Sequence, residues 1–386
     1  MQNGPSAGVE PHSRNRAPSD RSQPSDGPRR LEWICDSPSP YNATLFRAVG
    51  AEAGLDLTVH FIRSQTGQHP WQASLADGFR SRFFRRRLGA DWRLVRSAAT
   101  DRRSLWVVGS WYETTTQLIL TARALRRRPF AVWTDTPQEH RKRGPLKGPL
   151  RSAWLAWVFR RATRVMGTGT PAVEVLRSMG APDERLLNFP YYIDVPSYRV
   201  SRQIPGRPLE FFSSGRLHPD KGYDLALRAL AAVLGDRPTE FRYRIAGTGA
   251  EQGRLAELAR TLGIGDRVEF LGWQQPDALV GAYASADIFL HPARSEPYGV
   301  TVLEAMASGL VVVGSDATAA VLDRIDHGVN GYIHRSGDAE HLAQQILAVI
   351  GDPGRIPTIK RAARKRAEEW PLSRGVATVL DLARSE

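Results

Sequence analysis

The sequence predicts an α/β protein with two domains, each built on a doubly wound parallel sheet. Short apolar segments alternate with segments of helical length, which is the pattern of parallel strands joined by crossover helices. The 386 residues are enough for two separate hydrophobic cores. Between the halves, residues 194–208 contain three prolines and a glycine, which indicates a linker. We therefore predict domains at residues 29–200 and 201–370, facing each other across a cleft.

The C-terminal half shows this alternation most clearly. We expect six strands, at residues 209–215, 243–249, 267–273, 286–293, 310–316 and 331–335. Each is followed by a predicted helix, at residues 223–234, 251–262, 278–285, from about 300, 318–325 and 339–350. These short apolar strands suit a parallel sheet that is buried on both faces.

The N-terminal half shows the same alternation of predicted strands and helices, although less regularly. Its predicted strands are residues 30–36, 56–62, 104–111, 129–135, 164–169 and 186–194, and its predicted helices are residues 43–53, 114–127, 150–162 and 171–179. Residues 1–28 are rich in serine, proline, glycine and arginine and lack the apolar core of a signal peptide. We expect them to form a disordered tail on a cytoplasmic protein.

Cysteine content and apolar run lengths exclude several classes of protein. The single cysteine, Cys35, excludes an intrachain disulfide and a thiolate metal cluster, and its apolar neighbours predict a core position. No histidines, aspartates and cysteines have the spacing of metal ligands, so we predict no metal site. No apolar run approaches the roughly 20 residues that a bilayer-spanning helix needs.

Residues 295–309, SEPYGVTVLEAMASG, place two carboxylates around a predicted loop-to-helix junction. Glu296 lies just beyond the strand predicted at 286–293, where open α/β sheets bind their ligands. A helix is expected to begin near Val300, and its free N–H groups attract anions. Glu304 lies about one turn inside that helix, within reach of a polyol such as ribose. The segment therefore predicts a site for an elongated ligand that carries phosphate.

A second motif, GRLHPDKG at residues 215–222, follows a predicted strand and opens the next helix. Arg216 and Lys221 are thereby placed beside a helix N-terminus, where a pyrophosphate would bind. The planar guanidinium of arginine grips phosphate oxygens with two hydrogen bonds, and lysine adds a compact charge.

Together the two motifs resemble the retaining glycosyltransferases of family 4, which have the GT-B fold of two Rossmann-like domains. The similarity extends over roughly residues 211–353, nearly half of the chain. It implies that Glu296 contacts the donor sugar and Glu304 the ribose, while Arg216 and Lys221 stabilise the departing nucleoside diphosphate without a metal. The other donor-binding residues expected around these motifs are Gly215, Gly247, His291, Tyr298, Gly299, Val300 and Thr301.

The resemblance also implies the chemistry. It predicts a hexosyltransferase-type, retaining enzyme that uses a UDP- or GDP-sugar and no cofactor. In this family the favoured mechanism is front-face attack, in which the leaving phosphate takes the proton of the acceptor. Glu296 is then expected to position the donor and to stabilise an oxocarbenium-like transition state. The inter-domain hinge is expected at residues 188–198, and a last helix at 371–386 is expected to complete the first domain.

The N-terminal half departs from the family pattern. The loop after the first strand reads SPSPYNATLF, without the glycines that usually approach the donor phosphates, so Asn42 and Ala43 are expected there instead. Other strand ends supply the acceptor-side candidates Ser110, Trp111, Asp135 and His140. An aspartate–histidine pair can orient an acceptor hydroxyl, and the basic residues at 141–147 can bind an acceptor phosphate.

Positive charge is concentrated in the N-terminal half. Residues 1–200 contain 31 lysines and arginines against 17 aspartates and glutamates, whereas residues 201–386 contain 22 against 23. Residues 79–96 form the densest run, in which seven arginines alternate with aromatic residues. Such a surface predicts docking to anionic lipid headgroups.

We therefore predict a peripheral enzyme of polysaccharide biosynthesis, at the inner face of the membrane, that adds a sugar to a glycan or lipid-linked acceptor. A GT-B enzyme without acceptor transfer, such as a nucleotide-sugar epimerase or a phosphorylase, is the main alternative, and a relative that only binds is another. The basic charge also admits a nucleic-acid-binding protein. However, no nucleic-acid motif is evident, so no nucleic-acid partner is expected.

Overall fold

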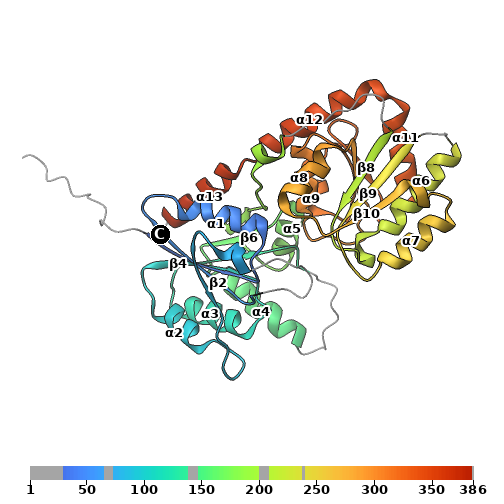
Figure 1. Cartoon of the computed structure of the whole chain (residues 1–386). Coiled ribbons are helices and arrows are strands. Elements are labelled where there is room, and N and C mark those ends of the chain that lie inside the picture. The colour runs from blue at the N-terminus through green and yellow to red at the C-terminus, as the bar shows by residue number, and fades with distance from the viewer. Residues whose placement is uncertain (1–28, 65–72, 138–146, 200–207, 237–239, 385–386) are drawn as a thin grey trace, which may run out of the picture.

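The computed structural model describes residues 29–64, 73–137, 147–199, 208–236 and 240–384. The predicted tail at 1–28 lies outside these residues. The chain forms two α/β lobes, and the last two helices run from the second lobe back to the first (Figure 1). The predicted fold class, two doubly wound parallel sheets, is confirmed.

The first lobe is built on a parallel sheet whose strands follow the order β3-β2-β1-β4-β5-β6-β7. The strands are β1 (Arg29–Cys35), β2 (Leu55–Phe61), β3 (Arg80–Phe83), β4 (Ser104–Gly109), β5 (Phe130–Thr134), β6 (Arg164–Gly167) and β7 (Leu186–Asn188). The order reverses between β1 and β4. At such a point the loops that leave neighbouring strands diverge, which opens a crevice at the carboxyl edge of the sheet.

Helices cover both faces of this sheet. They are α1 (Pro40–Gly50), α2 (Trp92–Thr100), α3 (Thr114–Leu125), α4 (Lys147–Phe159) and α5 (Thr170–Ser178). Successive side chains of β1 alternate between the faces: Trp33 packs with α1, whereas Ile34 packs with α3 and α4. The apolar end of β1, Trp33–Cys35, therefore follows from burial on both sides.

The second lobe repeats this architecture with the strand order β10-β9-β8-β11-β12-β13. Its strands are β8 (Leu209–Ser214), β9 (Phe241–Ala246), β10 (Val268–Gly272), β11 (Ile288–His291), β12 (Val311–Ser315) and β13 (Tyr332–His334). Its helices are α6 (Tyr223–Asp236), α7 (Gln252–Thr261), α8 (Pro276–Ala284), α9 (Val300–Ala307), α10 (Ala319–Arg324) and α11 (Ala339–Gly351). Here the order reverses between β8 and β11, the two strands that lead into the predicted motifs.

The chain returns to the first lobe through α12 (Ile356–Glu368) and α13 (Leu372–Arg384). Pro371 separates these helices, and α13 packs its apolar face against α1 and β1. The ring of Trp370, at the crossing, lies between the guanidinium groups of Arg324 and Arg374, at 3.6 and 3.7 Å. Both cation–π contacts fix the path of the chain at this point.

Three predictions about elements need correction. The strand predicted at 186–194 ends at Asn188, because Pro190 has no N–H group to continue the ladder. The first helix begins at Pro40 rather than Ala43, with Ser39 as its N-cap. The basic run 79–96 contains the edge strand β3 and the start of the exposed helix α2, which were not predicted because arginines obscure the apolar pattern.

Candidate active site

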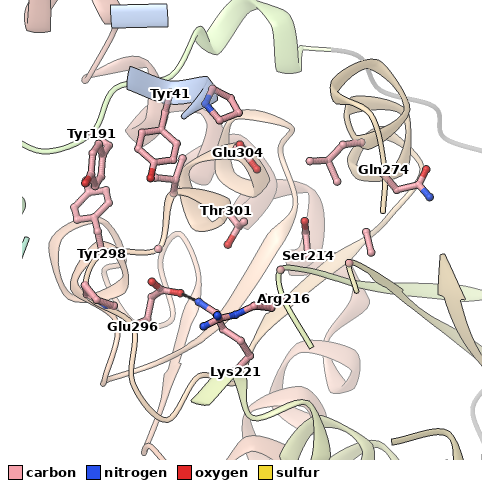
Figure 2. A pocket seen from close by; sticks show the side chains of 18 of the residues that line it. Tyr41, Tyr191, Ser214, Arg216, Lys221, Gln274, Glu296, Tyr298, Thr301 and Glu304 are labelled. Atoms are coloured by element: carbon pink, nitrogen blue, oxygen red, sulfur yellow. Dashed lines mark hydrogen bonds and ion pairs between the residues drawn. The ribbon is translucent and has the colours of Figure 1, made fainter. Parts of the chain in front are cut away.

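A cavity of about 290 Å³ lies where the carboxyl edges of the two sheets face each other. The loops after β1 and β5 line it from the first lobe, and the loops after β8, β9, β10 and β11 line it from the second. Figure 2 shows Glu296, Lys221 and Arg216 at one end of this cavity and Tyr41, Tyr191 and Tyr298 along one side. The two topological switch points thus meet at one site.

Glu296 is the carboxylate at the centre of the charged group. Its side chain is only 14% exposed and forms an ion pair with Lys221 Nζ (Figure 2). Burial favours the neutral acid, but the charge of Lys221 and the hydrogen bond that it donates prevail, and the pKa of Glu296 is lowered. Glu296 is therefore ionised at neutral pH, although it is withdrawn from water.

His291 lies behind Glu296 and does not line the cavity. Its Nε2 atom is 3.9 Å from Glu296 Oε2, which is too far for a hydrogen bond. Burial lowers the pKa of His291 to about 4, so the ring is neutral at physiological pH. His291 supports the loop that carries Glu296 and does not face the ligand space.

Arg216 and the neighbouring glycines form the floor beside Lys221. The Nε atom of Arg216 is buried and has no hydrogen-bond partner among the described residues. Gly247 approaches the backbone of Gly215 so closely that a Cβ atom on it would lie 1.9 Å from the Gly215 carbonyl oxygen. Its φ of +138° also favours glycine. This turn leaves room for a ligand against the backbone.

The N-terminus of α9 points into the same space. Gly299, at the N-cap, has a φ of +95° and no side chain to cap the helix. The first N–H groups of α9, from Val300 and Thr301, are left without a capping side chain at the edge of the cavity. Free N–H groups and the helix dipole attract anions.

Glu304 lies one turn further along α9 and is held by two tyrosines. The Tyr198 hydroxyl donates to Oε1 at 3.1 Å, and the Tyr283 hydroxyl donates to Oε2 at 2.8 Å. Burial raises the pKa of Glu304, and the two hydrogen bonds only partly offset that effect. Each oxygen keeps a further lone pair, so the carboxylate can accept hydroxyl donors from a ligand.

The first lobe contributes an aromatic and acidic wall. The ring centroids of Tyr41 and Tyr191 are 4.5 Å apart, and those of Tyr191 and Tyr298 are 5.4 Å apart. The Tyr191 hydroxyl donates to Asp135 Oδ1 at 2.8 Å, and Thr168 Oγ1 donates to the same oxygen at 2.9 Å. Withdrawal from bulk water raises the pKa of Asp135, and the charge of Glu296 raises it further.

Hydrogen bonds join the two walls directly. Thr136 Oγ1 donates to the carbonyl oxygen of Pro297 at 3.1 Å. The backbone N–H of Thr170, at the start of α5, donates to the carboxylate of Asp323 at 3.0 Å. The first contact holds the loops after β5 and β11 against each other, and the second holds the start of α5 against α10.

The cavity brings together most of the residues predicted from the sequence. Those that line it are Glu296, Arg216, Lys221, Glu304, Gly215, Gly247, Tyr298, Gly299, Val300, Thr301 and Asp135.

Four other predicted residues lie away from the cavity, and a fifth, His140, is not among the described residues. Asn42 is buried and its amide donates to Cys35 Sγ at 3.5 Å, away from the cavity, while Ala43 lies in the core. Ser110 has a φ of +70° but does not line the cavity, and Trp111 is fully buried in the first lobe.

Several lining residues were not predicted: Pro40, Tyr41, Tyr191, Ser214, Thr248, Trp273, Gln274 and Leu279. Thr248 and Trp273 directly follow β9 and β10, so their positions at strand ends were the signal available in the sequence. Tyr191 had no such signal, because the strand was predicted to continue to residue 194 and Tyr191 then lay inside it.

The described residues contain no group of three or more histidines, cysteines, aspartates and glutamates that could hold a metal ion. Within the same ranges, no helix is long and apolar enough to cross a membrane.

The sequence and the fold are similar to those of known glycosyltransferases. Residues 194–369, which comprise the second lobe and α12, match the family described as glycosyl transferases group 1. The resemblance to glycosyltransferases is confirmed over these residues, whereas family 4 and the retaining mechanism stay predictions. Solved glycosyltransferase structures superpose on both lobes, and the fold is GT-B.

Particular relatives are similar over different extents. A D-inositol 3-phosphate glycosyltransferase of Nocardia farcinica is 31% identical over 207 residues, which cover 50% of this chain and 46% of that protein. This chain thus spans about half the length of the curated relatives that it matches.

Structural similarity extends over nearly the whole chain. Anabaena HepE, solved in complex with UDP, has a TM-score of 0.73 at 19% identity, covering 92% of this chain and 100% of that one. The apo lipopolysaccharide outer core galactosyltransferase WaaB has a TM-score of 0.71 at 15% identity, covering 92% and 99%.

Proposed function

We propose that this protein is a retaining glycosyltransferase that moves a sugar from a nucleoside-diphosphate sugar to a glycan or lipid-linked acceptor. One observation supports this above all others. Arg216, Lys221 and the uncapped N-terminus of α9 converge on one cavity, beside the ionised carboxylate of Glu296. Two cations and a helix N-terminus suit a diphosphate, and a carboxylate suits the sugar next to it.

We propose one orientation for the donor in this cavity. Its diphosphate would lie between Arg216 and the start of α9, where the buried Nε of Arg216 has no partner among the described residues. The ribose would then reach Glu304, whose two oxygens are held by tyrosine hydroxyls. The base would occupy the far end, beside Trp273 and Gln274.

UDP is the nucleotide we propose, with GDP as the alternative. Anabaena HepE, which shares the fold, has been solved with UDP and with UDP-glucose. In the present chain the residues that follow β9 and β10 line the end of the cavity where a base would bind.

Transfer would break the bond between the anomeric carbon and the diphosphate oxygen and form a bond from that carbon to the acceptor oxygen. The acceptor proton would pass to the leaving diphosphate, so atoms and charges balance without a further reactant. Arg216 and Lys221 would stabilise the negative charge that builds up on the leaving group. Glu296, ionised and withdrawn from water, would stabilise the positive charge on the sugar ring.

Binding of UDP, GDP and ADP to the purified protein tests the donor site. In thermal unfolding with each nucleotide at the same large excess, the correct one should stabilise the protein most, by roughly 2.7 kcal/mol where its concentration is about 100 times its dissociation constant. We expect UDP to stabilise the protein, and Arg216→Ala and Glu304→Ala to weaken that effect. Arg228→Ala, which removes an exposed arginine of α6, is the matched control. Lack of stabilisation by all three nucleotides would contradict the proposal.

Action at a membrane surface is a separate part of the proposal. Phe83, Leu88 and Trp92 are 38%, 96% and 52% exposed, and they lie among exposed arginines of β3, α2 and the segment between them. Exposed apolar side chains among cations suit an anionic bilayer, at about 1 kcal/mol per basic residue.

Flotation with anionic and neutral vesicles across a salt series tests this docking. We expect binding to phosphatidylglycerol vesicles that weakens as salt rises, because salt screens exposed charges. Arg87→Glu combined with Arg93→Glu should reduce binding, whereas Arg228→Glu on the second lobe should not. Binding that ignores lipid charge and salt would contradict electrostatic docking.

A further inference from the structure

We propose that Tyr198, in the linker between the lobes, is a positioning residue for the donor: its hydroxyl fixes the carboxylate of Glu304, and the fixed carboxylate selects a ribonucleotide. The inference rests on the proposed function and deepens it, because it assigns a part in donor recognition to a residue that does not line the cavity. The sequence placed Tyr198 only at the end of the expected hinge.

Glu304 receives one tyrosine hydroxyl on each of its oxygens. Tyr198, at the end of the one-turn helix Val195–Tyr198, donates to Oε1 at 3.1 Å. Tyr283, in α8, donates to Oε2 at 2.8 Å. Two donors from different elements fix the plane of the carboxylate as well as its position. The lone pairs that remain on the two oxygens are therefore held in set directions, on a residue that lines the cavity.

Tyr198 is itself held firmly against the second lobe. Val195 is buried in the core of that lobe, and Tyr198 packs against the same core. Arg199, the next residue, forms an ion pair with Glu368 of α12 at 2.7 Å. The ring of Tyr198 lies edge-on to that of Tyr283, with the centroids 6.0 Å apart. The end of the linker therefore belongs to the second lobe and keeps its place against α9.

The paired oxygens of Glu304 match the chemistry of a ribose. A ribose carries two neighbouring hydroxyls, and each can donate to one oxygen of an ionised carboxylate. Burial raises the pKa of Glu304, whereas the hydrogen bonds from Tyr283 and Tyr198 lower it. Tyr198 thus orients the carboxylate and also favours the ionised form, in which both oxygens accept. A sugar without these hydroxyls gains nothing from either effect.

Of the two tyrosines, Tyr198 allows the cleaner experiment. Tyr283 is fully buried, and its ring packs against Phe212 and Phe289 in the core. Tyr198 is only half-buried. Tyr198→Phe keeps the ring and removes the hydroxyl, so it isolates the hydrogen bond to Glu304.

The test compares UDP with 2′,3′-dideoxy-UDP by isothermal titration calorimetry on the full chain. Wild type should prefer UDP by about ten-fold or more, because two hydrogen bonds to a carboxylate are lost with the dideoxy sugar. Tyr198→Phe should weaken UDP by about three- to ten-fold and leave the affinity for dideoxy-UDP unchanged. Tyr243→Phe is the matched control, since its hydroxyl is hydrogen-bonded to Ser213 at 2.8 Å, outside the cavity. The control should change neither affinity.

Two further readouts show whether Tyr198 acts through Glu304. In a Glu304→Ala background, Tyr198→Phe should cause no additional loss of UDP affinity, because no carboxylate is left to position. The ratio of the two affinities should also fall at a higher pH in Tyr198→Phe than in wild type, since losing this hydrogen bond raises the pKa of Glu304 further. The diphosphate titrates in both ligands, so its contribution cancels in the ratio. Equal losses for both ligands, or additive losses in the double variant, overturn the inference.

Wild-type binding separates this inference from the proposed function. If wild type binds neither UDP nor GDP, the proposed function fails and the inference fails with it. If GDP is the nucleotide that binds, GDP and its dideoxy form replace the uridine pair. If wild type binds the nucleotide but does not prefer it to the dideoxy form, or if Tyr198→Phe keeps the full preference, the donor site stands and only the inference fails.

Discussion

The two walls of the cavity are built on the same architecture but differ in chemistry. The wall of the second lobe includes three glycines, a helix N-terminus, two cations and two carboxylates. The wall of the first lobe consists of side chains, chiefly two tyrosines and an aspartate.

This difference teaches how each wall is encoded. Backbone approach requires glycines at fixed positions, and a helix N-terminus requires a fixed loop, so the second wall leaves compact motifs in the sequence. The first wall gathers Tyr41, Asp135 and Tyr191 from three distant segments, and any one of them can be replaced without disturbing a turn. A wall of that kind leaves no local pattern.

The largest effect is expected from Lys221→Ala. The change removes one cation from the diphosphate site and leaves the buried carboxylate of Glu296 without its partner, so kcat should fall by about 10²–10³-fold. Lys360→Ala is the matched control, since Lys360 forms a similarly buried ion pair with Asp287, at 3.0 Å, outside the cavity. Steady-state transfer kinetics check this, and similar losses in both variants would show a general effect of buried ion pairs.

A smaller effect, on donor binding alone, is expected from Gly247→Ala. The added Cβ would meet the Gly215 carbonyl oxygen at 1.9 Å, so the turn must move and the diphosphate floor is lost. The stabilisation by UDP should fall by most of its value in thermal unfolding. Gly253→Ala in α7 is the control, because nothing lies within 4 Å of its added Cβ. The control substitution should raise the free energy of unfolding by about 0.5–1 kcal/mol. If UDP stabilised Gly247→Ala as much as wild type, the turn would not hold the donor.

The smallest effect is expected from a change of pH. It should alter the KM for the acceptor, which depends on the first wall, more than it alters kcat. The pKa of Asp135 is raised and that of Glu296 is lowered, so falling pH protonates Asp135 while Glu296 is still ionised. The KM for the acceptor should therefore rise at a higher pH than an ordinary aspartate would give, with kcat less affected. Asp135→Asn should flatten the acceptor KM profile, and a wild-type profile that is already flat would argue against this assignment.

Sequence patterns predicted the second lobe nearly completely. Each of its six strands was expected within a few residues, because their apolar runs alternate with helices that begin at clear loop signals. Arg216, Lys221, Glu296 and Glu304 all line the predicted site for the same reason.

The elements and residues that were not predicted have a common physical cause. Their positions are determined by tertiary contacts and not by the local sequence pattern. The strand β3 is an edge strand with exposed arginines, so its hydrogen bonds to β2 exist without an apolar signature. Asn42 was expected at the ligand because it follows a strand, yet its helix begins at Pro40 and turns it toward Cys35. Tyr191 enters the site from an irregular segment whose place depends on both lobes.

The stacked Trp370 defines how the two lobes can move. The chain joins the lobes twice, once after β7 and once between α12 and α13. Two lobes connected at two points rotate about the line through these points more easily than they slide past each other. The rings and guanidinium groups at Trp370 make the second tether stiff. Arg324, one of its partners, also donates a hydrogen bond to the Tyr298 hydroxyl at 3.4 Å, so the second tether is in direct contact with a residue that lines the cavity.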